Sequence, residues 1–99
     1  MTREDVLAKL REAFPDLQAR YALQGLSVFG STARNEAKAG SDIDLLVTFE
    51  SGRPCGFFAF FALRKELEGL LGASIDLVTL DALKPQMKDR ILAEAIRAA

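Results

Sequence analysis

Runs of apolar residues along the chain predict three strands separated by helices. Ile43 to Phe49 (IDLLVTF) is almost continuously apolar, as in a strand buried on both faces. Ala22 to Phe29 becomes apolar before it reaches Gly30, and Ser74 to Leu80 (SIDLVTL) has a similar composition, so both are predicted strands. The chain is therefore predicted to contain a sheet of three or more strands.

Other segments carry apolar residues at helical spacing. The first of them begins directly after Thr2 and is predicted to end at Pro15. Thr2 and Asp5 have the spacing of a variant capping box at its start. Ser51 to Gly56 has the composition of a loop. The predicted helices are residues 3 to 14, Ser31 to Ala37, the well-buried Phe57 to Leu71, and a last helix that starts at Asp81 to Pro85 and carries Met87, Ile91, Leu92, Ala95 and Ile96. Four phenylalanines cover more than one face of the third helix, so at least one is expected to leave the core, where it can pack against a partner chain: Phe57, Phe58, Phe60 and Phe61. The last helix, with Leu92, Ala95 and Ile96, offers another possible interface.

This order of elements predicts the fold class α/β (α+β), a small mixed sandwich in which helices cover a mixed sheet. A length of 99 residues with 49% hydrophobic content indicates one domain, residues 1 to 99, without a second lobe to hold a substrate. A partner is therefore expected to present the substrate.

Charge and composition exclude several classes of function. The net charge of −1 and the pI of about 5.4 argue against general nucleic-acid binding. Cys55 is the single cysteine, so the chain cannot form an internal disulfide. The longest apolar run, Phe57 to Leu63, is too short to span a bilayer, so no membrane association is expected. Together these features predict a cytoplasmic location. The chain has no histidine, which excludes imidazole metal sites and Ser/His/Asp triads.

Two acids stand where a buried strand begins, and their charges need compensation. Like charges about 5 Å apart repel by about 3 kcal/mol at an effective dielectric of about 20. Either one of Asp42 and Asp44 keeps its proton, or a cation lies between them. The nearest basic residues in sequence are Arg34 and Lys38. A bound divalent metal, Mg²⁺ for oxygen ligands, is the simpler interpretation.

Two further features point to phosphate chemistry. Gly30 allows close backbone approach, Ser31 adds a hydroxyl donor, and a helix that starts there would offer free N–H groups to phosphate oxygens. Asp76 is a third acid, in the middle of a predicted strand. Three acids suit two metal ions, and together with a phosphate-binding turn they favour phosphoryl or nucleotidyl transfer.

Each of these features also has a structural interpretation. Gly-Ser pairs are common in turns, and an Asp-x-Asp pair at a strand end can simply face water. Asp76 can cap a turn or pair with Arg34 or Arg90. Arg34 can neutralise a triphosphate, hold an acid of the site, or lie unused on the surface. The joint occurrence of these features, in this order of elements, favours the functional interpretation.

The sequence resembles the minimal nucleotidyltransferases of the DNA polymerase β superfamily over nearly its whole length. The resemblance is carried by Gly30-Ser31-Thr32-Ala33-Arg34, Ser41-Asp42-Ile43-Asp44-Leu45-Leu46-Val47 and Ile75-Asp76-Leu77-Val78. It implies that Gly30 and Ser31 bind nucleotide phosphates, that Asp42 and Asp44 bind two Mg²⁺ ions, and that Asp76 binds the ion that activates the acceptor hydroxyl. One departure is Asn35, where relatives commonly have glycine; asparagine tolerates a left-handed backbone, so the turn is expected to persist.

The resemblance also implies an activity and a partner. Similar small proteins are often antitoxins encoded beside an all-helical HEPN toxin, and some add AMP to a tyrosine of that toxin. We therefore expect transfer of a nucleoside monophosphate, AMP from ATP, to a hydroxyl on such a partner. Two alternatives stay open: a module that neutralises its partner by binding alone, and a homodimeric transferase that acts on a small hydroxylated molecule. The nucleotide, the acceptor hydroxyl and the oligomeric state are not determined by the sequence.

Overall fold

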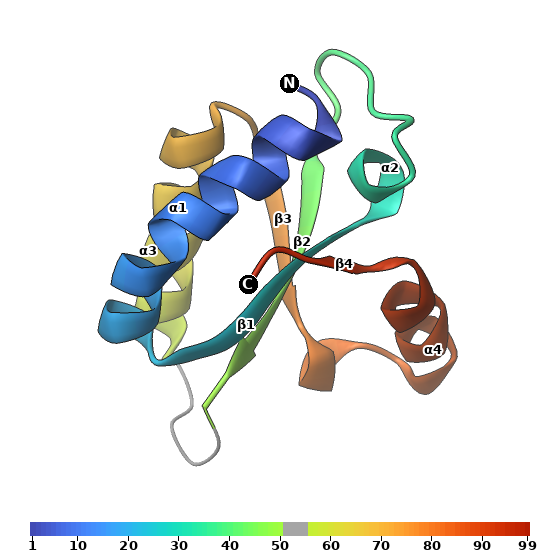
Figure 1. The fold of residues 1–99 in the computed structure, drawn as a ribbon. Coiled ribbons are helices and arrows are strands. Elements are labelled where there is room, and N and C mark those ends of the chain that lie inside the picture. The colour runs from blue at the N-terminus through green and yellow to red at the C-terminus, as the bar shows by residue number, and fades with distance from the viewer. Residues whose placement is uncertain (51–55) are drawn as a thin grey trace.

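A computed structural model describes residues 1–50 and 56–99 of the protein (Figure 1). The loop predicted for Ser51 to Gly56, which includes Cys55, lies outside the described residues except for Gly56. The elements are α1 (Arg3–Tyr21), β1 (Leu23–Phe29), α2 (Gly30–Ala33), β2 (Ile43–Phe49), α3 (Phe57–Leu71), β3 (Ile75–Thr79), a 3₁₀ turn (Leu80–Ala82), α4 (Pro85–Glu94) and β4 (Ile96–Arg97).

The four strands form one mixed sheet in the order β3-β2-β1-β4. β1 is antiparallel to both β2 and β4, whereas β2 and β3 are parallel and are connected through α3. The predicted class, helices on a mixed sheet of three or more strands, is confirmed. The parallel pair matters for function because it places corresponding residues of β2 and β3 beside each other.

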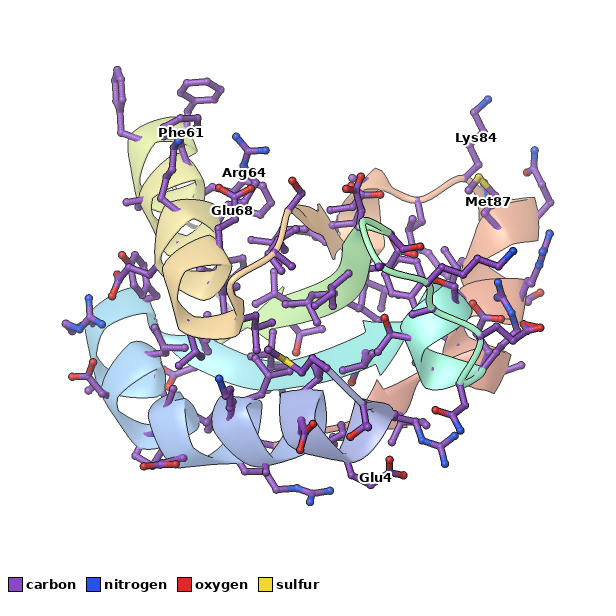
Figure 2. All side chains as sticks on the ribbon, turned by 90° about the horizontal axis from the view of Figure 1, so that it is seen from above. Glu4, Phe61, Arg64, Glu68, Lys84 and Met87 are labelled. Carbon is purple, nitrogen blue, oxygen red and sulfur yellow. The ribbon has the colours of Figure 1, made fainter. Side chains whose placement is uncertain are left out.

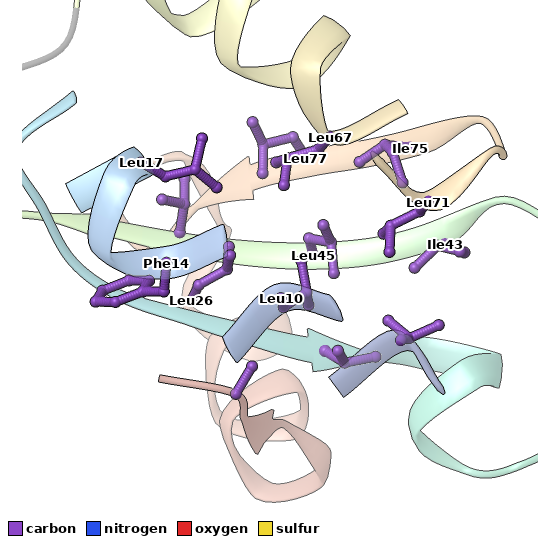
Figure 3. Packing of buried hydrophobic residues seen from close by; sticks show 14 of the residues in the cluster. Leu10, Phe14, Leu17, Leu26, Ile43, Leu45, Leu67, Leu71, Ile75 and Leu77 are labelled. Carbon is purple, nitrogen blue, oxygen red and sulfur yellow. The ribbon is translucent and has the colours of Figure 1, made fainter. Parts of the chain in front are cut away.

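Each face of the sheet has its own hydrophobic cluster. α1 and α3 lie side by side and pack Leu10, Phe14, Leu63 and Leu67 onto one face, against strand residues that include Leu45 (Figures 1 and 3). α4 covers part of the other face through a smaller cluster of Phe29, Leu46 and Ile91, with Val78 beside it. The second face is only partly covered, and this is the face of the candidate site.

Helix α1 does not end at Pro15 as predicted but continues to Tyr21. A proline inside a helix loses one backbone hydrogen bond and crowds the preceding turn. Packing on both sides of it outweighs this cost, since Phe14 and Leu17 are both buried in the larger cluster. The helix instead ends at Ala22, which adopts a left-handed conformation with φ of 58°.

Three other predictions needed correction. The helix after β1 covers only Gly30–Ala33 and does not reach Ala37. The last helix ends at Glu94, and Ile96 belongs to the short strand β4, which the pattern did not predict because two residues are too few for a periodicity. Helix α3 has the predicted bounds but is less buried at its start than predicted: Phe57 and Phe58 are 79% and 85% exposed, which confirms that at least one phenylalanine of this segment leaves the core.

Within residues 1–50 and 56–99, no helix has the length and apolar character needed to cross a membrane.

Candidate active site

Asp44 and Asp76 lie side by side on the partly covered face of the sheet. They are register partners in the parallel pair β2 and β3, where neighbouring strands are about 4.8 Å apart. Because side chains alternate along a strand, Asp44 shares its face with Leu46, and Asp76 shares its face with Val78. Asp42, which is exposed, directly precedes β2. The structure thus brings together the two acids that are separated by more than 30 residues in the sequence.

Gly30 lies against the carboxylate of Asp44. The last residue of β1, Phe29, is the register partner of Asp44, so the chain leaves β1 directly beside this acid. Gly30 has a φ of +70°, and a Cβ atom added there would lie 2.9 Å from Asp44 Cγ and closer still to Oδ2. A residue with a side chain would therefore both strain the backbone and displace Asp44. The glycine is required here for close approach as well as for its conformation.

The surroundings of Asp44 raise the pKa of its carboxyl group from 3.8 to about 6. Partial burial is the largest cause, followed by the negative charges of Asp76 and Asp42 and by a hydrogen bond with the Asp76 carboxyl. The positive charge of Arg34 opposes this shift without cancelling it. The site therefore carries more negative charge than its own residues neutralise, which is what a cation-binding site requires.

Replacing Asp44 with asparagine is expected to stabilise the metal-free protein at pH 7.5. Because the folded-state pKa of Asp44 is raised, its contribution to stability is fully present below about pH 4 and is lost as the pH rises through about 6. Asparagine stays neutral, so the variant should gain about 1 kcal/mol at pH 7.5, or roughly 4–8 °C in Tm, a value reduced for the partial exposure of the site. Thermal unfolding in the presence of a chelator measures this.

The same comparison at pH 4 is the control for Asp44→Asn. Both proteins are then largely neutral at this position, so the gain in Tm should vanish. An equal gain at both pH values, or a loss at pH 7.5, would show that the Asp44 charge is not the cause.

The chemistry of these side chains fits Mg²⁺, which prefers carboxylate and other oxygen ligands. Asp42, Asp44 and Asp76 are the residues that would hold it. Within the part of the chain that the structure describes, however, no group of three or more potential ligands is already gathered as for a metal ion. The fit therefore rests on the donor chemistry and on the uncompensated charge at Asp44, and the number of ions stays a prediction.

The segment after Gly30 contains the other predicted site residues. Ser31 is half-buried in the short helix α2, and Arg34 ends that helix. Asn35 has a φ of 61°, so the left-handed turn expected at this position is present. The guanidinium of Arg34 donates from Nε to Glu36 at 2.7 Å and from Nη1 to Glu94 at 3.0 Å. Arg34 is thus near the acids, but two other carboxylates hold it.

Glu94 is a residue of this site that the sequence analysis missed. Its Oε1 atom accepts a hydrogen bond of 2.8 Å from the backbone N–H of Gly30, and its Oε2 atom accepts from Arg34. It is 64 residues from Gly30, so no motif connects the two. One local signal was available: an acid in the last turn of a helix faces the negative end of the helix dipole, which is an unfavourable position without a specific partner.

Two hollows flank this region. One, of about 240 Å³, is lined by apolar residues of β1 and α4 together with Gly30, Arg34, Arg90 and Glu94. A larger one, of about 400 Å³, is lined by Thr32, Lys38 and Ser41 among others and includes none of the three aspartates. The smaller hollow is not lined by the aspartates either, but it adjoins the candidate site through Gly30 and Arg34.

Comparison with known sequences identifies homologues over most of the chain. The sequence model of the family described as "Nucleotidyltransferase domain" matches residues 7–98. Protein adenylyltransferase MntA of Thermococcus cleftensis is 35% identical over 96 residues, which cover 97% of this chain and 95% of that protein. A Methanocaldococcus jannaschii protein that is named as a provisional protein adenylyltransferase is 43% identical over 77 residues. These residues cover 78% of this chain and 81% of that protein.

Solved structures share the fold. A structure described as a minimal nucleotidyltransferase aligns with a TM-score of 0.80 at 44% identity, over 97% of this chain and 95% of that one. A chain from a toxin-antitoxin complex with AMP-PNP aligns with a TM-score of 0.73 at 21% identity, over 90% of this chain and 72% of its own length. At 21% identity, the similarity to the toxin-antitoxin chain is evidence for the fold alone.

Proposed function

Because this chain belongs to the nucleotidyltransferase domain family, we propose that it is a protein adenylyltransferase that transfers AMP from ATP to a hydroxyl on a partner protein. The observation that carries the proposal is the pairing of Asp44 with Asp76 on an open sheet face, with Gly30 pressed against Asp44. That arrangement concentrates negative charge beside a glycine, whose backbone N–H and C=O groups no side chain covers. It suits a cation that also binds a triphosphate.

The proposed reaction forms one bond and breaks another at the α-phosphorus. The acceptor hydroxyl oxygen bonds to that phosphorus, the bond to the oxygen that bridges the α- and β-phosphates breaks, pyrophosphate leaves, and the hydroxyl proton passes to solvent water. Bound Mg²⁺, held by Asp42, Asp44 and Asp76, would neutralise charge on the phosphates and lower the pKa of the hydroxyl. Gly30 and Ser31 would contact the phosphates, and Arg34 would add positive charge beside them.

The proposed acceptor is an all-helical HEPN partner, with the chain acting as its antitoxin. A structural neighbour is described as a tri-AMPylated Shewanella oneidensis HEPN toxin in complex with MNT antitoxin, aligned here with a TM-score of 0.66 at 19% identity. This supports the choice of acceptor for the assay. A domain of 99 residues has little room for a second substrate pocket, which also favours an acceptor presented by another protein.

The direct test uses ATP labelled at the α-phosphate, Mg²⁺, and a helical HEPN protein encoded beside this chain. The expected result is label transferred to that partner by the wild-type protein and none by an Asp44→Asn, Asp76→Asn double variant. Absence of transfer across several nucleotides and divalent metals would contradict the proposal. Full neutralisation of the partner by the double variant would instead favour the alternative of a non-catalytic binding module.

We further propose that the partner contacts the exposed start of α3. Phe57 and Phe58 are in edge-to-face contact with ring centroids 5.6 Å apart, and both are mostly exposed. The charged groups of Arg64 and Lys65 lie over the ring of Phe61, at 5.2 and 5.5 Å from its centroid. An apolar patch with a basic edge suits a partner surface that combines apolar and acidic side chains. Figure 2 shows Phe61 and Arg64 together on α3, well away from Met87 on α4.

Replacing Phe58 with serine is expected to weaken partner binding about 10-fold or more without affecting stability. Phe58 is 85% exposed, so its loss removes little packing from the free protein, whereas a buried aromatic contributes strongly to an interface. Leu92→Ser is the matched control, since Leu92 is an exposed apolar residue on α4. Calorimetry with the partner measures the affinities. Equal weakening by both variants, or by neither, would show that the patch is not the docking surface.

A further inference from the structure

Glu94 joins the end of α4 to both ends of α2. One oxygen of its carboxylate accepts from the Gly30 N–H at 2.8 Å, and the other accepts from Arg34 Nη1 at 3.0 Å. These hydrogen bonds, together with the charges of Arg34 and Arg90, lower the pKa of Glu94, so the group is ionised at neutral pH. A single carboxylate therefore fixes two groups of one short segment, which lie 64 and 60 residues before it in the sequence.

Both groups that Glu94 holds act on Asp44, one by contact and one by charge. Gly30 lies against the Asp44 carboxylate, and the charge of Arg34 acts on the pKa of Asp44. Glu36 holds the other side of Arg34 through Nε at 2.7 Å. With Nε and Nη1 engaged, Nη2 has no recorded acceptor among the described residues, so the guanidinium is held in place while it keeps donors for a further anion.

We propose that Glu94 is a positioning residue of the nucleotide site, which holds the Gly30 backbone and the Arg34 guanidinium in place beside Asp44. This inference rests on the proposed function, because it assigns Glu94 a role in binding the same nucleoside triphosphate. A side chain that holds both groups before the nucleotide arrives reduces the ordering that binding requires. Glu94 itself need not touch the nucleotide.

A competing interpretation makes the opposite prediction. The Gly30 N–H and the Arg34 guanidinium are both anion-binding groups, so Glu94 could occupy the place of a phosphate that must displace it. Removal of the carboxylate would then strengthen nucleotide binding, whereas loss of a positioning residue weakens it. The sign of the change in affinity therefore separates the two interpretations.

The test measures binding of an ATP analogue that cannot be cleaved between the α- and β-phosphates, in Mg²⁺, by calorimetry. Glu94→Ala is expected to weaken binding about 10-fold or more, because it removes two hydrogen bonds from a charged acceptor. Glu94→Gln keeps an oxygen for the Gly30 N–H and is expected to lose less, about 3-fold to 5-fold. Glu36→Gln removes a contact of Arg34 but none of Gly30, so it should lose less than Glu94→Ala. Asp89→Asn is the matched control, since Asp89 is an exposed acid on α4 outside the site, and it should change the affinity less than about 2-fold.

A second readout is independent of the nucleotide. In the free protein, the amide proton resonance of Gly30 should shift in Glu94→Ala, shift less in Glu94→Gln, and stay in place in Glu36→Gln. Tighter or unchanged nucleotide binding by both Glu94 variants would overturn the inference while the proposed function stands. Failure of the wild-type protein to bind the analogue would overturn both, even if the Gly30 resonance responds as expected.

Discussion

Replacing Asp76 with asparagine is expected to lower the rate of AMP transfer by about 10²–10³-fold, with the protein still folded. The change keeps the shape of the side chain but removes a charge that would neutralise the phosphates through a cation, and loss of one such group typically has this effect. Asp76 is exposed, so the substitution disturbs little packing. Rates of label transfer at saturating ATP measure the loss, and circular dichroism confirms the fold.

Controls for Asp76→Asn come from the same chain. Asp89 is an exposed acid on α4 outside the site, and Asp89→Asn should change the rate less than about 2-fold. Asp44→Asn should cause a loss similar to that of Asp76→Asn, and the double variant should lose little more, because residues that act as one unit are not additive. Independent, multiplying losses would show that the two acids do not share a ligand.

Replacing Gly30 with alanine is expected to destabilise the protein by about 2–4 kcal/mol and to abolish most activity. The left-handed φ of +70° alone costs an alanine about 1 kcal/mol, and the added Cβ atom would also overlap the Asp44 carboxylate. Relief of that overlap requires Asp44 or the β1 end to move, which separates the carboxylate from Asp76. Denaturant unfolding and the transfer assay measure the two effects.

Gly72 offers a matched control for Gly30→Ala. Its φ is +65°, nearly the same, but an added Cβ atom there has no neighbour within 4 Å among the described residues. Gly72→Ala should therefore lose only about 1 kcal/mol and keep its activity. Equal losses of stability in the two variants would mean that backbone strain explains the whole effect and that contact with Asp44 contributes nothing.

The two elements whose apolar pattern is least interrupted were predicted to the residue. β2 (Ile43–Phe49) and α3 (Phe57–Leu71) have the predicted bounds, because long runs of apolar residues fix both the type and the extent of an element. The parallel pairing that aligns Asp44 with Asp76 was not predicted, although both acids were identified. Register between strands depends on tertiary packing, which a single sequence records only indirectly.

The remaining differences have physical causes that lie outside any local pattern. Pro15 would end an isolated helix, but burial of Leu17 on the far side keeps α1 continuous. The pattern at the start of α3 predicted that at least one phenylalanine leaves the core. It did not identify Phe57 and Phe58 as the exposed ones, because the pattern records hydrophobicity and not what covers it. Glu94 acts through a partner 64 residues away, and its place at the end of a helix was the one sign that it had a specific partner.

The proposed activity requires Asp44 and its neighbouring acids to bind a divalent cation together with a nucleoside triphosphate. The most direct measurement is calorimetric titration of the wild-type protein and of Asp44→Asn with a non-cleavable ATP analogue, each with Mg²⁺ and with a chelator. We predict binding by the wild-type protein that depends on Mg²⁺, and binding at least about 10-fold weaker by Asp44→Asn. Equal affinity in all four titrations, or no binding in any, would contradict the proposal.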